Sequence, residues 1–156
     1  MAKTLVAYFS ATGTTEHTAG VLARELGADL AKIAPTAPYT AADLDWNDKD
    51  SRSTQEMNDA HARPALATQP GDLSAYDTVL IGFPIWWYVA PRIVETWIEA
   101  ADLANKTVIT FATSGGSGMG QTTAKLAQLA PQASWHNGQV LHGDAAAQRW
   151  ASSLEL

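Results

Sequence analysis

The chain has 156 residues, of which 46% are hydrophobic, and this size and composition suit one domain, residues 1–156, with an ordinary core. The formal net charge of −6 leaves no basic patch that could neutralise phosphates, so we expect no nucleic-acid partner. The lack of cysteine excludes disulfides, thiol redox chemistry and Cys-ligated metal sites.

The start of the chain predicts a helix between two strands. Leu5–Phe9 is a short apolar run of β-formers bounded by polar residues, which is typical of a strand. Apolar residues then recur at helical spacing, and Gly27 lies where a glycine commonly ends a helix. These apolar positions are Ala19, Leu22, Ala23 and Leu26. Asp29–Ala34 is a weaker, alternating strand that ends at Pro35.

Residues Thr36–Ser74 differ in character and predict an irregular excursion over the surface. Six acidic residues lie from Asp43 to Asp59, against Lys49 and Arg52, and this stretch is most simply a solvated face. The sequence Ser53-Thr-Gln-Glu56 matches a capping box, which predicts that one short helix begins there.

The second half of the chain alternates strands with helices. Thr78–Phe83 and Thr107–Ala112 are continuous apolar runs of the kind found in strands buried on both faces. Pro91 suits the first position of the helix between them. The inner stripe of that helix is predicted to be Ile93, Val94, Trp97, Ile98 and Ala101.

The last quarter of the chain predicts a helix, a strand and a helix. Gln121–Leu129 is typical of a helix that stops before Pro131, and a final strand lies within Ala133–Leu141. Asp144 is expected to cap a closing helix. The inward-facing residues of that helix are Ala147, Trp150, Ala151 and Leu154. This alternation predicts a three-layer α/β domain, with a five-stranded parallel sheet covered by about five helices.

Three polar or aromatic segments follow predicted strands: Ser10–Thr15, Pro84–Tyr88 and Thr113–Gly118. Because parallel strands end at the same edge of a sheet, we expect all three segments to meet there. Ligands of such sheets bind at this edge, beyond the carboxyl ends of the strands. This convergence is the strongest functional signal in the sequence.

The first segment enters the start of a helix, where unpaired N–H groups and the helix dipole favour an anion. Its four hydroxyls and one glycine suit a phosphate monoester held by hydrogen bonds, because Lys and Arg are absent. A nucleoside triphosphate or a dinucleotide is not expected, because neither G-x-x-x-x-G-K-[ST] nor G-x-G-x-x-G is present. The alternative is that Ser and Thr only cap the helix.

The second segment places Trp86, Trp87 and Tyr88 in succession after a buried strand. One ring is expected in the core, and at least one other is available to stack on a flat ligand, because all three cannot enter the same core. Glycines and small hydroxyls in the third segment allow backbone amides to approach a ligand edge. A plain flexible turn is the alternative for that segment.

Together these segments resemble the flavin-binding loops of a flavodoxin, and the resemblance covers nearly the whole chain. Ser10-Ala-Thr-Gly-Thr-Thr15 is similar to the family's loop for the phosphate of flavin mononucleotide, FMN. Phe83-Pro-Ile-Trp-Trp-Tyr88, followed by Pro91, resembles the second flavin loop in the subgroup that carries P-x-W-W, and Thr113-Ser-Gly-Gly116 resembles the third. The resemblance implies a flavodoxin-like three-layer sandwich with strand order 2-1-3-4-5, and FMN as the cofactor.

The resemblance also implies a role for each segment. The residues that hold the phosphate are expected to be Ser10, Thr12, Gly13, Thr14 and Thr15. The residues that flank the ring are expected to be Pro84, Ile85, Trp86, Trp87 and Tyr88, with one of the two tryptophans stacked on it. Hydrogen bonds to the polar edge of the flavin are expected from Thr113, Ser114, Gly115 and Gly116.

Charge bears on the redox properties of such a flavin. The three segments contain neither Lys nor Arg, and the nearest cation, Arg92, is expected to be a solvated residue of the first helical turn. Little would then stabilise negative charge on the reduced flavin, so we predict a low potential for the fully reduced couple.

The sequence leaves three functions open. The first is a low-potential electron carrier between a redox partner protein and an acceptor, and the second is an FMN-dependent NAD(P)H:quinone-type oxidoreductase. The third is a non-redox module that has lost FMN. Carriers of the family usually surround the flavin with acidic residues, whereas Phe83–Val94 and the third segment contain none. Whether the protein is an enzyme is therefore open.

Other chemistry is not expected. The four histidines, at positions 17, 61, 136 and 142, lack metal-ligand spacing and predict no metal site. The N-terminal segment has no signal-type apolar region, and no apolar run approaches the ~18 residues of a membrane span. The expected location is the cytoplasm.

Overall fold

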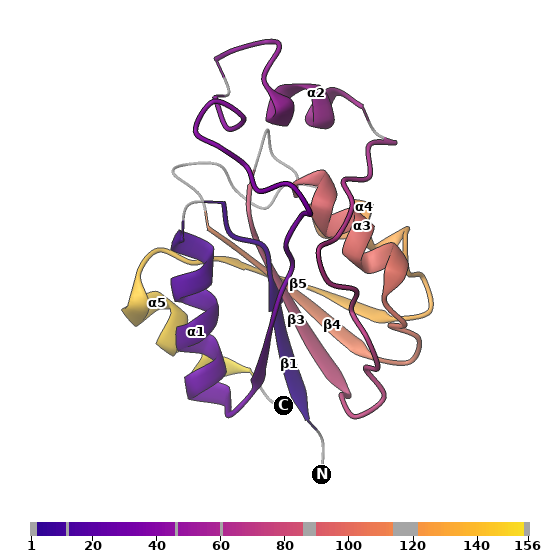
Figure 1. The fold of residues 1–156 in the computed structure, drawn as a ribbon. Helices are drawn as coiled ribbons and strands as arrows, with labels where there is room; N and C mark the ends of the chain where they lie inside the picture. The colour runs from indigo at the N-terminus through magenta and orange to yellow at the C-terminus, as the bar shows by residue number, and fades with distance from the viewer. Residues whose placement is uncertain are drawn as a thin grey trace.

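The computed structural model describes residues 3–11, 13–45, 47–59, 61–85, 90–113 and 122–154. Within these residues, five parallel strands form one sheet in the order β2-β1-β3-β4-β5 (Figure 1). The strands are β1 (Thr4–Tyr8), β2 (Asp29–Lys32), β3 (Thr78–Pro84), β4 (Thr107–Thr113) and β5 (Ser134–Val140). The helices are α1 (Thr14–Leu26), α2 (Arg52–Asn58), α3 (Arg92–Ala100), α4 (Thr122–Ala127) and α5 (Asp144–Ser153). The predicted fold class and strand order are confirmed.

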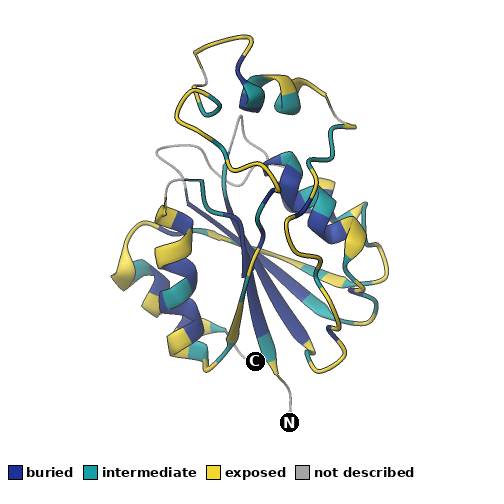
Figure 2. Cartoon of the chain, viewed as in Figure 1, coloured by how far each residue is buried: buried dark blue, intermediate teal, exposed yellow. Residues whose placement is uncertain are grey.

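Helices cover both faces of the sheet, with α1 and α5 on one side and α3 and α4 on the other (Figure 1). Alternate side chains of β1 serve the two layers: Val6 and Tyr8 pack with α1 and α5, while Leu5 and Ala7 pack with α3 and α4. The central strands β1, β3 and β4 are buried, whereas β2 and β5 at the edges carry exposed residues (Figure 2). Burial on both faces explains the continuous apolar runs of the central strands.

The excursion between β2 and β3 contains α2, which lies beyond the carboxyl end of the sheet, and the chain then returns past α3 to the start of β3 (Figure 1). An antiparallel bridge between Pro35 and Leu66 closes its base. The prediction that α2 begins at a capping box on Ser53 is wrong. Ser51 is the N-cap: its backbone is extended and its Oγ accepts the N–H of Thr54 at 3.3 Å. Ser53 is already inside the helix and is buried, and its N–H donates to the carbonyl of Asp43 at 2.9 Å.

Two other helix starts also differ from the prediction by one residue. Pro91 has the extended ψ of 148° and is the N-cap of α3, which begins at Arg92. Asp144 is the first residue of α5 rather than its cap, because Gly143 occupies the N-cap position at φ 86°. Gly27 does end α1 in the left-handed conformation, at φ 63°. In the described part of the chain, no helix has both the length and the apolar character needed to cross a membrane.

Candidate functional site

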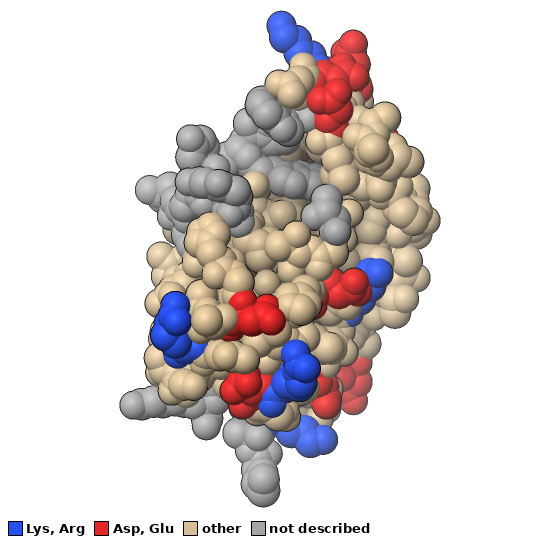
Figure 3. Space-filling model, turned by 90° about the vertical axis from the view of Figure 1, so that its left-hand side faces the viewer, with Lys and Arg blue, Asp and Glu red and all other residues tan. Residues whose placement is uncertain are grey.

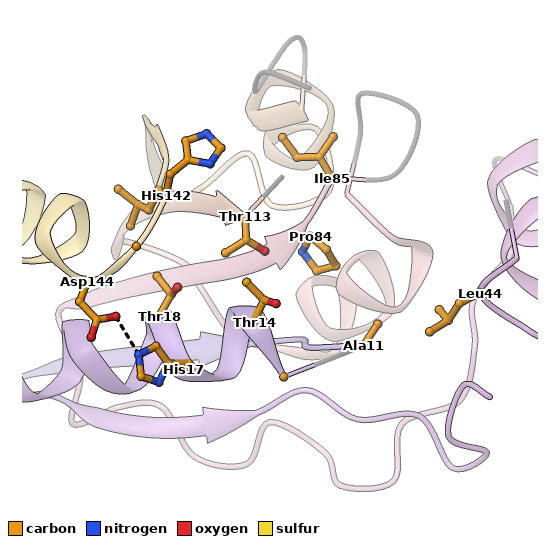
Figure 4. Close-up of a pocket in the computed structure, with 13 residues that line it drawn as sticks. Ala11, Thr14, His17, Thr18, Leu44, Pro84, Ile85, Thr113, His142 and Asp144 are labelled. Carbon is orange, nitrogen blue, oxygen red and sulfur yellow. Dashed lines mark hydrogen bonds and ion pairs between the residues drawn. The ribbon is translucent and has the colours of Figure 1, made fainter. Parts of the chain in front are cut away.

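A cavity of about 950 Å³ lies at the carboxyl edge of the sheet (Figure 4). Its walls come from the loop before α1 and the first turns of that helix, from the ends of β3 and β4, and from the segment between β5 and α5. Leu44 adds a wall from the excursion. Segments that follow four different strands therefore meet at this edge, as expected for parallel strands.

Five of the predicted site residues line this cavity. They are Gly13, Thr14, Pro84, Ile85 and Thr113. Two others support the wall from behind: the Oγ of Ser10 accepts the N–H of Gly13 at 3.0 Å, and the buried hydroxyl of Thr15 bonds that of Thr113 at 2.7 Å. The remaining predicted residues lie outside the described part of the chain. These are Thr12, Trp86, Trp87, Tyr88, Ser114, Gly115 and Gly116.

The start of α1 is built to receive an anion. Its N-cap residue is Gly13, whose φ of 97° lies in a region that favours glycine. Glycine has no side chain that could occupy the N–H groups of the first turn, so the proposal that Ser and Thr only cap this helix does not apply at that position. The hydroxyl of Thr14 stands at the same helix end, beside the cavity (Figure 4). These groups match a phosphate monoester.

The segment Leu141–Asp144 is a fourth wall that the sequence analysis missed. This segment lines the cavity together with His17 and Thr18 of α1. The Nε2 of His17 lies 2.7 Å from Oδ1 of Asp144, and both side chains are more than half exposed, at 65% and 55%. One signal could have found this segment, because it follows the fifth parallel strand and must emerge at the same edge as the other three.

The cavity wall has little positive charge. Among the described lining residues there is neither Lys nor Arg, and the titratable side chains are His17, His142 and Asp144. A search of the same part of the chain finds no group of three His, Asp or Glu side chains arranged to hold a metal ion. The polar groups of the wall are therefore hydroxyls, backbone amides, two imidazoles and the carboxylate of Asp144.

Arg92 is not the solvated residue that the sequence predicts. Its Nε donates to the carbonyl of Glu56 at 3.2 Å, its Nη2 to the carbonyl of Met57 at 3.0 Å, and its Nη1 to Oε1 of Glu95 at 2.6 Å. Only 13% of the side chain is exposed. Its charge is thus balanced by a carboxylate and by carbonyls at the end of α2.

Polar contacts within the excursion stabilise the part of it that lies next to the cavity. The N–H of Thr40 donates to the carboxylate of Asp43, and the Thr40 hydroxyl accepts the N–H of Asp43 in return. The guanidinium of Arg52 lies 3.9 Å from the ring centroid of Tyr39 and pairs with Glu56 at 3.0 Å. These contacts hold the turn that presents Leu44 to the cavity.

The face formed by α1 and α5 carries mixed charge. Figure 3 shows acidic and basic side chains interspersed on the lower part of this face, with further charged groups at the top, over the excursion. The acidic stretch of the excursion is partly neutralised, because Asp43 and Glu56 both pair with Arg52.

The chain is similar to proteins of one family over nearly its whole length. A protein-family model described as flavodoxin matches residues 3–155. Two provisionally named flavoproteins are close in structure. One, from Bacteroides eggerthii, is 49% identical with a TM-score of 0.90, and each chain is 97% covered. The other, from Bacteroides uniformis, is 48% identical with a TM-score of 0.93, and 97% of this chain and 99% of that chain are covered.

A more distant structure shares the fold. It is a flavoprotein in complex with FMN from Lactobacillus acidophilus, 20% identical with a TM-score of 0.72, and 97% of this chain and 99% of that chain are covered. The comparison with curated proteins finds no significant match. The family match, the sheet order and the cavity at the carboxyl edge agree, and the chain belongs to the flavodoxin family.

Proposed function

We propose that this protein binds FMN in the cavity at the carboxyl edge and serves as a low-potential electron carrier. The observation that carries the proposal is the composition of the cavity wall, in which the start of α1 meets the ends of β3 and β4 without a Lys or Arg among the described lining residues. Hydroxyls and helix N–H groups suit a phosphate monoester dianion. The fit to FMN is supported by the family and by the FMN that the Lactobacillus acidophilus flavoprotein binds.

Each part of FMN has a place in this arrangement. Ser10 and Thr12–Thr15 hold the phosphate, with Gly13 and Thr14 at the cavity wall. Pro84–Tyr88 flank the ring in the manner of the P-x-W-W subgroup, and Thr113–Gly116 bond its polar edge. FMN supplies one-electron and two-electron redox chemistry when bound, and the protein binds and orients it within one domain of residues 1–156. A location in the cytoplasm is part of the proposal.

The low potential follows from the charges around the cavity. Arg92 is committed to Glu95 and to the end of α2, so it offers no uncompensated cation to a reduced flavin. Reduction adds negative charge, which this wall stabilises little. A redox titration of the FMN-loaded protein should find the fully reduced state harder to reach than in free FMN. Equal ease would contradict the proposal.

A second candidate is an FMN-dependent NAD(P)H:quinone-type oxidoreductase. It is favoured by the lack of Asp and Glu in Phe83–Val94, where carriers usually present acidic groups to basic partners. Leu44 adds an apolar wall to the same cavity. Such an apolar surface would bind an apolar small molecule more tightly than a charged surface would.

Two measurements separate the three possible functions: electron carrier, oxidoreductase and non-redox module. The first is the visible spectrum of the purified protein during titration with FMN, which should show the bound flavin. A folded protein that takes up no FMN would favour the non-redox module instead. The second compares steady-state oxidation of NAD(P)H in the presence of a quinone with electron delivery from a flavodoxin reductase. Fast delivery with slow turnover supports the carrier, and the reverse supports the oxidoreductase.

A further inference from the structure

The cavity contains a histidine–carboxylate pair that the three predicted flavin loops do not include. His17 comes from α1 and Asp144 from the first turn of α5, and their side chains meet at 2.7 Å at the cavity wall (Figure 4). These residues are 127 positions apart in the chain. Two helices on the same face of the sheet are thus joined at the ends that border the cavity.

The imidazole of His17 lies near the groups proposed to hold the phosphate. The backbone N–H of His17 donates to the carbonyl of Gly13 at 3.0 Å, and the His17 side chain lines the cavity together with Thr14. The other titratable groups around it are Asp144 on α5, His142 before α5, and Glu16 on α1. The carboxylate of Glu16 accepts the hydroxyl of Tyr8 on β1 at 3.1 Å.

We propose that protonated His17 is the cation that meets the FMN phosphate, and that Asp144 is a positioning residue that holds its imidazole at the cavity wall. The inference rests on the proposed binding of FMN. A protonated imidazole between a carboxylate and a phosphate interacts favourably with both, whereas a neutral one loses most of this attraction. Because the described cavity wall has no Lys or Arg, this histidine makes phosphate recognition dependent on pH.

Proton binding and FMN binding therefore reinforce each other. FMN affinity should increase toward acid pH, because only a protonated imidazole attracts the phosphate, and bound FMN should in turn favour the protonated ring. The phosphate itself takes up a proton near about pH 6, which acts in the opposite direction. The proper reference is therefore a protein variant without this imidazole, because the phosphate of FMN takes up its proton in the same way with both proteins.

The test titrates FMN and riboflavin into the wild-type protein and His17→Gln, between about pH 6 and pH 8, following flavin fluorescence. Glutamine retains an N–H donor for Asp144 but carries no charge. Wild type should bind FMN more tightly than the variant at the acid end, by up to about fivefold, which is the upper end of the range for an exposed ion pair. The ratio should approach one at the alkaline end. Riboflavin, which has no phosphate, should bind both proteins equally.

Asp144→Asn serves as a second variant, because it keeps an oxygen acceptor and removes the charge. It should weaken FMN binding at the acid end toward that of His17→Gln and leave riboflavin binding unchanged, since the imidazole loses the carboxylate that positions it. A flat FMN ratio with intact FMN binding would overturn this inference and leave the proposed function standing. An equal loss for riboflavin would also overturn it. Failure of the folded wild-type protein to bind FMN at any pH would overturn both.

Discussion

Gly82 interrupts the apolar run of β3 because an aromatic ring occupies the space next to it. A Cβ built on this glycine would lie 2.0 Å from Cζ of Phe111, its paired residue on β4. Phe111 is completely buried and contacts Trp150 of α5, with ring centroids 6.1 Å apart. The missing side chain on β3 thus makes room for the ring that joins the sheet to α5.

Replacing Gly82 with alanine should lower the free energy of unfolding by about 1–3 kcal/mol, because the core must shift to admit a methyl group. Urea denaturation measures this change. Gly20→Ala on α1 is the matched control, since no atom lies within 4 Å of its added Cβ. Alanine there should stabilise the helix by about 0.5–1 kcal/mol. Equal effects of the two substitutions would contradict this account of Gly82.

The phenol of Tyr39 makes the free energy of unfolding depend on pH. Burial raises the pKa of Tyr39 far above its usual value. The hydrogen bond from its hydroxyl to the carboxylate of Glu56 is the second largest cause and acts in the same direction. The folded protein therefore holds this proton more tightly than the unfolded chain does. The associated stability is fully present below the unfolded pKa of about 10 and is lost as the pH rises above it.

Comparison of wild type with Tyr39→Phe isolates this effect, because all other titrating groups are shared. Near about pH 9, wild type should be more stable by about 1 kcal/mol owing to the hydrogen bond. Between about pH 9 and pH 11, urea denaturation should show this advantage shrinking. An advantage that grows with pH would refute the assignment.

At the scale of elements, the excursion is joined to α3 by arginines. Arg92 donates to two carbonyls at the end of α2, as described above, and Arg63 pairs with Glu95 at 3.1 Å and with Glu99 at 2.7 Å. Both arginines are mostly shielded from solvent, with side-chain exposures of 13% and 26%. The charged side chains of α3 thus bind the excursion, which has little regular structure of its own.

Arg92→Ala should loosen this junction, because it removes the guanidinium bonds to the carbonyls of Glu56 and Met57 and leaves Arg63 as the ion-pair partner of Glu95. The expected loss is about 1–3 kcal/mol of unfolding free energy. Hydrogen exchange should speed up in α2 more than in β1 or β3. Arg24→Ala, an exposed change in the last turn of α1, should leave that exchange unchanged. Unaltered exchange in α2 of the Arg92 variant would rule out this role.

In the molecule as a whole, the cavity joins the layer of α1 and α5, the edge of the sheet and the excursion. Its wall combines the start of α1, the ends of β3 and β4, the segment before α5, and Leu44 of the excursion. A ligand there contacts elements from the whole chain, so its binding energy adds to the stability of the entire fold.

FMN at 100 times its dissociation constant should therefore stabilise the protein by about 2.7 kcal/mol. For a chain of this length, such a gain should raise Tm by roughly 5–10 °C, which calorimetry can measure. Riboflavin at the same concentration should give a smaller shift, because it has no phosphate for the start of α1. A correctly folded protein whose Tm does not respond to FMN would count against the proposed function.

Local sequence patterns were enough to predict the strands and helices, their order, and the edge of the sheet at which the cavity lies. Hydrophobic periodicity and the glycine at position 27 are local signals, so they report strands, helices and one helix end directly. The edge follows from topology, because all parallel strands end on the same side. Gly13, Pro84 and Thr113 could thus be assigned to one site before any coordinates.

Which distant residues share the cavity, and which groups surround the charged side chains, became clear from the three-dimensional packing. His17 and Asp144 meet although 127 positions separate them, Leu44 reaches the cavity from an irregular segment, and Arg92 turns toward α2. Ser51 rather than Ser53 is the N-cap of α2, and the N–H of Ser53 donates to Asp43, ten residues earlier in the chain. Local patterns carry no information about such contacts, because they arise only when packing brings remote parts of the chain together.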